Sequence, residues 1–335
     1  MEIDPPLCET FDKLVRTSPI KTLDHDQNLL IDKVDEFELP VIDLSHLNLG
    51  PQEKEKCVED MVDAATKWGF FQIVNHGIPQ EMLETVKDEE KKVFHQDFAK
   101  KADEKFLNLS ANSYRWGNPA TTLVSRFLWH ESLHVSVSEI SKIKGNDGLR
   151  FSLEEFTDTV AKLAERISVI LSASFGVESS FFQENCPTGC SYLRLNRYPP
   201  CPVSSKVYGF IPHTDSGILT IVYQDGVGGL QLMKDGRWFS VKPNPTALIV
   251  NVGDLLEALS NGVYRSIRHR VLAPGGVERL SLAYFYCPSF DAVIQSCSEP
   301  PKYKKFSFGE YMLQIGKDVR ATGDKVGLSR FLNVL

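Results

Sequence analysis

The sequence predicts a mixed α/β fold in which a β-rich core is flanked by helices. Residues 190–290 hold seven short strand-like segments separated by turns, a spacing that is typical of a sandwich or jelly roll. Within this stretch, Asp235-Gly236 between two strand-like runs is a strong signal for a two-residue hairpin. The first third of the chain instead alternates strand-like and helix-like segments.

The helices and strands of the first third follow from local signals. "LPVIDLSHL" (39–47) and "FFQIVNHGIP" (70–79) are strand-like runs. Each is followed by an amphipathic helical pattern, at 53–69 and at 80–98. Gly69 is placed to end the first helix, because glycine readily adopts the left-handed backbone of a helix C-terminus.

The strongest helix signal lies at residues 152–176. Ser152 and Glu155 have the spacing of a capping box, which places the start of the helix at Ser152. Shorter helices are expected near 8–15 and over 305–319. The long helix should bury one apolar stripe, formed by Phe156, Val160, Leu163, Ala164, Ile167 and Leu171.

Composition excludes several classes of protein. The net charge of −7 and the absence of a Lys/Arg-rich tract argue against a nucleic-acid partner. The N-terminus has no apolar signal-peptide core, and no apolar run approaches the roughly 20 residues of a transmembrane helix. The seven cysteines are spread over the chain, which indicates reduced thiols. We therefore expect a cytoplasmic protein, with the nucleus as an additional compartment and no membrane association.

The segment "IPHTDSGILTIV" (211–222) places an imidazole and a carboxylate on one face of a strand. His213 and Asp215 are two residues apart, and side chains alternate faces with a period of two. One interpretation is a buried His–Asp hydrogen bond that fixes a turn. The other is part of a metal site, since imidazole and carboxylate suit divalent iron, zinc or manganese.

A third metal-ligand candidate is His269, in the strand-like "YRSIRHRVLAP" of the same β-rich region. Two histidines and one carboxylate with open positions form the facial triad of non-haem Fe(II) oxygenases. A zinc hydrolase could use three such ligands as well.

The strand "RLSLAYFY" argues against hydrolysis, because Arg279 and Ser281 share one of its faces. A buried arginine needs an anion, and its planar fork grips a carboxylate. The alternative is an edge strand with Arg279 in solvent. In "LRLNRYPP", Asn196 and Tyr198 also share a face and can donate hydrogen bonds.

These motifs together resemble those of the plant 2-oxoglutarate- and Fe(II)-dependent dioxygenases. The resemblance covers about residue 38 to the C-terminus and includes "WGFFQIVNHGIP", "NRYPPC", HTD, "RSIRHRV" and RLS. The family's usual NYYPPC reads NRYPPC here, with Arg197 on the outward side of the strand, and we expect no functional consequence. It implies a distorted double-stranded β-helix, a cupin-like jelly roll. His213, Asp215 and His269 would bind iron, and Arg279 and Ser281, assisted by Asn196 and Tyr198, would bind 2-oxoglutarate. Oxygen would be the oxidant, and ascorbate the reductant that keeps iron as Fe(II).

The same resemblance divides the chain into five regions. We expect a flexible N-terminal arm (1–37), the family's N-terminal α/β region (38–150), a long helix supporting the core (151–185), the Fe(II)/2-oxoglutarate jelly-roll domain (186–290) and a C-terminal helical segment (291–335).

The segment from "SYRWGNPATT" to "RFLWHESLHV" further resembles the gibberellin 2-oxidases that act on C20 gibberellins. This resemblance implies 2β-hydroxylation of a small carboxylic acid, which inactivates a hormone precursor. The alternatives are oxidation at C20, another substrate such as a flavonoid, or a catalytically silent protein that binds a small acid. The candidate substrate contacts, any of which can equally be ordinary core or surface residues, are Tyr114, Arg115, Trp116, Arg126 and His134, with Arg115 or Arg126 facing the substrate carboxylate.

Overall fold

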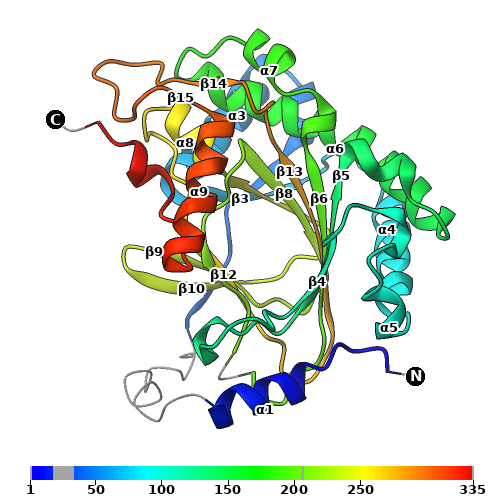
Figure 1. The fold of residues 1–335 in the computed structure, drawn as a ribbon. Helices are drawn as coiled ribbons and strands as arrows, with labels where there is room; N and C mark the ends of the chain where they lie inside the picture. Colours follow the sequence, from blue (N-terminus) through cyan, green and yellow to red (C-terminus); the bar gives the residue numbers. More distant parts are fainter. Residues whose placement is uncertain (1, 18–33, 205–206, 334–335) are drawn as a thin grey trace.

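Two β-sheets pack face to face in the computed structural model, which describes residues 2–17, 34–204 and 207–333 (Figure 1). The larger sheet has eight strands in the order β2-β3-β11-β8-β13-β6-β5-β4, and the smaller has five in the order β1-β10-β9-β12-β7. The two sheets form the expected jelly-roll core. The strands of the larger sheet are β2 (Val41–Asp43), β3 (Phe70–Val74), β4 (Tyr114–Trp116), β5 (Glu131–Ser136), β6 (Tyr192–Tyr198), β8 (Leu219–Gln224), β11 (Leu248–Val252) and β13 (Arg279–Tyr286). Those of the smaller sheet are β1 (Glu36–Phe37), β7 (Tyr208–His213), β9 (Leu230–Lys234), β10 (Arg237–Val241) and β12 (His269–Leu272).

Helices cover the outer face of the larger sheet. The covering helices are α3 (Pro51–Trp68), α4 (Gln80–Phe94) and α6 (Asp147–Ala173). Both α4 and α6 contact β13, and the expected apolar stripe of α6 lies in the main core cluster. The remaining elements are α1 (Leu7–Thr17), α5 (Phe98–Lys101), α7 (Ser180–Asn185), α8 (Asp254–Leu259), α9 (Phe308–Thr322) and the small pair β14 (Val293–Ile294) and β15 (Phe306–Ser307). In Figure 1, α9 lies on the opposite side of the strands from α4.

Two backbone signals in the sequence are confirmed. Asp235 and Gly236 both have positive φ and connect β9 to β10, whose pairing begins at Lys234 and Arg237. This geometry belongs to the hairpin turns that match the twist of the strands. Gly69 ends α3 with φ of 62°, and a Cβ there would lie 2.2 Å from the carbonyl oxygen of Arg265.

The predicted capping box of α6 is wrong. The helix begins five residues earlier, at Asp147, and the side chain of Asn146 accepts a hydrogen bond from the Leu149 amide. Ser152 is buried inside the helix, where its hydroxyl donates to the Leu149 carbonyl. A serine can satisfy its hydroxyl against its own helical turn, so the Ser-x-x-Glu spacing alone did not mark the terminus.

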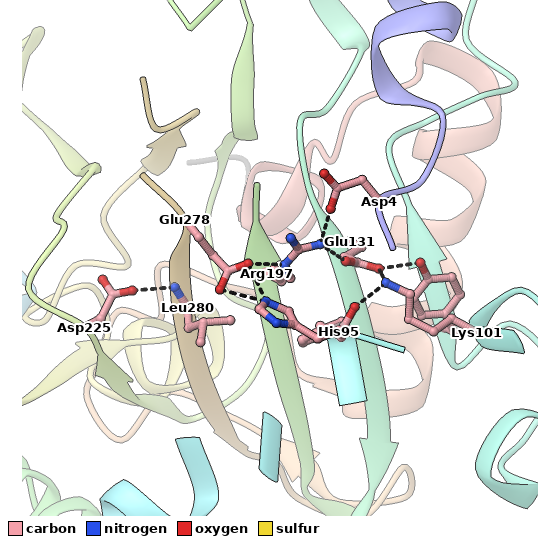
Figure 2. Close-up of polar contacts among 10 residues, drawn as sticks. Asp4, His95, Lys101, Glu131, Arg197, Asp225, Glu278 and Leu280 are labelled. Carbon is pink, nitrogen blue, oxygen red and sulfur yellow. Dashed lines mark hydrogen bonds and ion pairs between the residues drawn. The ribbon is translucent and has the colours of Figure 1, made fainter. Parts of the chain in front are cut away.

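Arg197 lies on the outward side of β6, as the sequence predicted, but it has structural partners that the sequence did not indicate. Arg197 does point away from the cavity between the sheets, but that side is covered by chain, and the residue is only 4% exposed. Its guanidinium pairs with Glu131 at 2.6 Å, with Asp4 at 2.7 Å and with Glu278 (Figure 2). Glu131 in turn pairs with the buried Lys101 at 2.6 Å.

This buried ion network fixes the start of β13. Glu278 accepts from both Arg197 and His95, and the backbone amide of Leu280 donates to Asp225 (Figure 2). Glu278 and Leu280 flank Arg279. The network at Glu278 and the separate Asp225 contact at Leu280 therefore hold both sides of the arginine that the sequence assigns to carboxylate binding.

No helix among the described residues is long and apolar enough to span a membrane. The seven cysteines all fall within the described ranges, and each is a free thiol.

We predict that Arg197→Met lowers the free energy of unfolding by about 3–5 kcal/mol, because it leaves the buried Glu131 carboxylate short of a partner. Denaturant unfolding measures this change. The matched control is Lys56→Met, which breaks the exposed pair with Asp60 and should change stability little. Equal decreases in the free energy of unfolding in the two variants would show that the buried network stabilises the fold no more than an exposed ion pair does.

Candidate active site

A cavity between the two sheets collects the polar side chains that the strands direct inward. It is lined by alternate residues of β6, β8 and β13 from the larger sheet and by residues of β7, β9 and β12 from the smaller one. Aromatic and aliphatic side chains complete its wall, including Phe70, Phe210, Val222, Leu230 and Phe285. The cavity therefore combines an apolar wall with many polar and charged side chains that the strands direct inward.

His213, Asp215 and His269 meet at one end of this cavity. His213 ends β7, Asp215 lies in the turn that follows, and His269 begins β12, directly paired with His213. Asp215 Oδ1 lies 3.5 Å from His213 Nε2 and 3.7 Å from His269 Nε2. Their potential ligand atoms all lie within 4.8 Å of one another. His213 and Asp215 lie together as the sequence predicted, but not on one face of a strand, because β7 ends at His213 and Asp215 lies in the connection that follows.

Neighbouring groups fix the orientation of all three side chains. His213 Nδ1 lies 2.8 Å from the Ile211 carbonyl oxygen, and His269 Nδ1 lies 3.0 Å from that of Ile267. A ring N–H that donates to a carbonyl leaves the opposite nitrogen, Nε2, as the metal-binding atom.

Asp215 is held through one carboxylate oxygen only. Its Oδ2 accepts hydrogen bonds from the Thr220 hydroxyl at 2.7 Å and from the Asn251 amide at 2.8 Å. Its Oδ1, which faces the two histidines, is left to coordinate a metal. Such supporting contacts are typical of metal-binding carboxylates.

Burial and neighbouring charges set the protonation of this cluster. Burial lowers the pKa of His269 to about 4, with a further contribution from His213. Burial alone would raise the pKa of Asp215, but His269, His213 and the Thr220 hydroxyl outweigh it, so that its pKa lies well below the usual value. A neutral imidazole and an ionised carboxylate are the forms that bind a metal ion.

The donor set fits Fe(II). Two imidazole nitrogens and one carboxylate oxygen are present, and the cluster has these three members among the residues that the structure describes. A structural zinc site would be closed by a fourth protein ligand, whereas an open three-ligand set leaves positions for other ligands.

Arg279 lies elsewhere in the same cavity, buried to 2% exposure, so the edge-strand alternative is wrong. Its guanidinium donates to Ser281 Oγ at 3.2 Å and to Gln224 Oε1 at 2.8 Å. Two buried donors, Arg279 Nε and Gln224 Nε2, have no hydrogen-bond partner among the described residues. A carboxylate would satisfy such donors, and an unpaired buried arginine is otherwise costly.

Asn196 and Tyr198 also line the cavity. The Tyr198 ring lies 4.8 Å from the Arg279 guanidinium, and a Cβ on Gly209 would come within 2.6 Å of that ring. The Asn196 side-chain amide donates to the backbone carbonyls of Arg194 and Ser281. Asn196 therefore contacts the neighbouring strand in addition to facing the cavity.

The five residues suggested as substrate contacts do not line this cavity as the structure describes it. Tyr114 donates to Glu131, and Trp116 packs edge-on against Phe98. Both lie on β4, the outermost strand of the larger sheet, together with the exposed Arg115.

The other two suggested contacts have partners outside the cavity. Arg126 pairs with Asp324 at 3.0 Å and donates to the Thr322 carbonyl. The His134 ring lies 4.5 Å from that of Tyr192, and burial lowers the pKa of His134 to about 4.

The sequence reasoning missed four polar residues of the cavity wall. They are Arg194, Thr220, Gln224 and Asn251. Three of them could have been found by extending the period of two: Arg194 lies two residues before Asn196, and Thr220 and Gln224 share a face of "ILTIVYQ". Asn251 gave no such signal, because it follows an unbroken apolar run.

Family models match both halves of the chain. The model of the 2OG-Fe(II) oxygenase superfamily matches residues 189–288, which contain His213, Asp215, His269 and Arg279. The model described as non-haem dioxygenase in morphine synthesis N-terminal matches residues 39–150.

Individual proteins that are similar to this chain in sequence or structure support the same family. The chain is 48% identical to gibberellin 2-beta-dioxygenase 8 of Arabidopsis thaliana, over 99% of both chains. It is 34% identical to 1-aminocyclopropane-1-carboxylate oxidase 2 of Malus domestica, over 82% of this chain and 85% of that one. The crystal structure of JOX2 in complex with 2OG, Fe and JA superposes with a TM-score of 0.73 at 30% identity, covering 86% of this chain and 88% of that one. Sequence, fold and donor set thus agree that this chain belongs to the 2OG-Fe(II) oxygenase superfamily.

Proposed function

We propose that this protein is a 2-oxoglutarate-dependent dioxygenase that hydroxylates a gibberellin at C2β, with a C20 precursor as substrate, and so inactivates a hormone intermediate. The observation that carries the proposal is that one cavity holds both a three-ligand cluster and a buried Arg279, which has no carboxylate partner in the part of the chain that the structure describes. A metal and a dicarboxylate co-substrate can therefore be bound beside each other.

The choice of a gibberellin is supported by the relatives. The match to a gibberellin 2-beta-dioxygenase is stronger and longer than the match to an aminocyclopropane-carboxylate oxidase. A cavity that combines aromatic side chains with placed cations suits a rigid diterpenoid acid. The seven free thiols support a reducing compartment, and we place the reaction in the cytoplasm.

His213, Asp215 and His269 would hold the iron. The two backbone carbonyls keep each imidazole N–H on Nδ1, so that both Nε2 atoms face the metal position. Thr220 and Asn251 keep Asp215 Oδ1 turned toward it. When bound, iron together with 2-oxoglutarate supplies the activation of O₂ that oxidation of an unreactive C–H bond requires.

Arg279, Ser281 and Gln224 would receive the far carboxylate of 2-oxoglutarate, with Tyr198 and Asn196 beside them. The orphaned Arg279 Nε and Gln224 Nε2 become hydrogen-bonded in that arrangement. The apolar wall of Phe70, Phe210 and Phe285 excludes water and orients the substrate, because position alone selects the carbon that reacts.

We predict that His269→Ala abolishes iron binding and turnover, because two of three ligands do not hold the metal in place. Metal analysis of the purified protein and a product assay measure the two effects. His46→Ala, which changes a histidine that is 49% exposed, is the control and should keep both. Wild-type iron content in His269→Ala would refute the assignment of the ligand.

Arg279→Met should raise the 2-oxoglutarate concentration for half-maximal turnover roughly 30-fold or more, because losing the partner of a desolvated carboxylate costs about 2–5 kcal/mol. Titration of 2-oxoglutarate at saturating substrate measures it. Arg237→Met, on the exposed side of β10, is the control and should behave as the wild type. An unchanged requirement in Arg279→Met would place the co-substrate elsewhere.

The reaction itself is tested by incubating the protein with Fe(II), 2-oxoglutarate, ascorbate and a C20 gibberellin acid. Mass spectrometry against reference compounds should identify a 2β-hydroxylated product, formed much faster than any product from a flavonoid of similar size. A C20-oxidised product would keep the family and overturn the inactivating role. Turnover of a flavonoid without turnover of any gibberellin would reject the substrate class.

A further inference from the structure

A second arginine lies in the same cavity and has no carboxylate partner among the described residues. Arg194 is on the cavity face of β6, two residues before Asn196. Its guanidinium lies 4.6 Å from the centre of the Phe210 ring, and its hydrogen bond from Nη2 to Ser132 Oγ is long, at 3.4 Å. Its Nε is buried and has no hydrogen-bond partner in the described structure.

The arginine on the opposite face of the same strand has a structural role, and it is paired with carboxylates. Arg197, three residues further along β6, pairs with three carboxylates, from Asp4, Glu131 and Glu278. Arg194 resembles Arg279 instead: both line the cavity, and both have a buried Nε that no described residue hydrogen-bonds. The two cavity arginines are therefore placed like ligand-binding groups.

Strand register separates Arg194 from the proposed 2-oxoglutarate site. Tyr198 pairs with Arg279, and Arg194 pairs with Ala283, four residues along β13, or about 13 Å at strand spacing. The next cavity-facing residue of β13, Phe285, pairs with Thr220, which holds Asp215. Arg194 thus lies toward the metal-binding end, away from Arg279.

Charge balance also leaves an anion to be bound. Asp215 is the one carboxylate among the residues that line the cavity, which also include the two arginines. Fe(II) with Arg194 and Arg279 brings four positive charges, whereas Asp215 and the 2-oxoglutarate dianion bring three negative ones. An uncompensated charge in a desolvated cavity is unfavourable, and one further carboxylate would neutralise it.

We propose that Arg194 binds a carboxylate of the substrate and thereby positions the rest of the molecule at the metal. The inference rests on the function proposed above and names the cation that the substrate acid meets. It replaces Arg115 and Arg126, the two arginines that the sequence favoured. A guanidinium suits this role because its planar fork can form two parallel hydrogen bonds with a carboxylate.

Binding without turnover tests the proposal. Calorimetry under anaerobic conditions, on protein loaded with Fe(II) and 2-oxoglutarate, gives the Kd of a C20 gibberellin acid and of its full methyl ester. The wild type should bind the acid roughly 30-fold or more tightly than the ester. In Arg194→Met the ratio of the two Kd values should fall to near one. The ratio is an internal control, because a general loss of structure weakens both ligands alike.

Arg115→Met and Arg126→Met are the matched controls, and both should keep the wild-type ratio. Loss of acid preference in either control, with its retention in Arg194→Met, would return the role to the arginine that the sequence favoured. Arg194→Lys keeps the charge without the planar fork, so its ratio should lie between the wild type and Arg194→Met. A full wild-type ratio in Arg194→Lys would contradict a contact through two parallel hydrogen bonds. The Arg194→Lys variant also keeps the proposal testable should Arg194→Met fail to fold.

Two further outcomes separate this inference from the proposed function. A wild type that binds and hydroxylates the acid but binds the ester equally well overturns the role of Arg194 and leaves the function standing. A wild type that binds no gibberellin overturns the proposed function itself, together with the substrate that this inference assigns to Arg194.

Discussion

The site depends on the pairing of β12 with β7, which sets His269 directly opposite His213. Residues opposite each other on antiparallel strands have side chains close together, and here both imidazoles face the cavity. A slip of one residue would turn His269 to the outside and bring its neighbour inward. That neighbour, Arg270, instead packs outside against Tyr208 and Trp238 and donates to Gln231, so the register is held from both faces of the sheet.

One face of the larger sheet packs in the hydrophobic core, and the other face lines the cavity. On the helix side, β6, β8 and β13 present Leu195, Ile221 and Leu282 to the main core. On the cavity side, the same strands present Arg194, Gln224 and Arg279, each of which has a buried donor without a partner among the described residues, an unfavourable arrangement without a ligand. The core on one face and the ion network around Arg197 together hold these strands in place, so that the polar groups of the other face stay fixed for ligands.

The sequence predicted what local periodicity controls. The common face of Arg279 and Ser281 followed from a period of two, and the Asp235-Gly236 turn followed from its residue types. His213 and Asp215 do meet, but the strand that the sequence predicted for both ends at His213. Partners distant in the chain were not predictable in this way. No local sequence pattern around Arg197 indicates its ion pairs with Asp4 and Glu131. The same is true of the ion pair between Arg126 and Asp324. Ser152 shows the same limit, because the true cap of α6, Asn146, competes with an equally plausible pattern further along the chain.

A crystal structure of the anaerobic protein with Fe(II) and 2-oxoglutarate tests the central claim most directly, since that claim concerns one cavity with two ends. The account predicts iron bound by Nε2 of His213, Oδ1 of Asp215 and Nε2 of His269, with the far carboxylate of 2-oxoglutarate hydrogen-bonded to Arg279 and Ser281. Iron held by other residues, or a co-substrate carboxylate that does not contact Arg279, would contradict it.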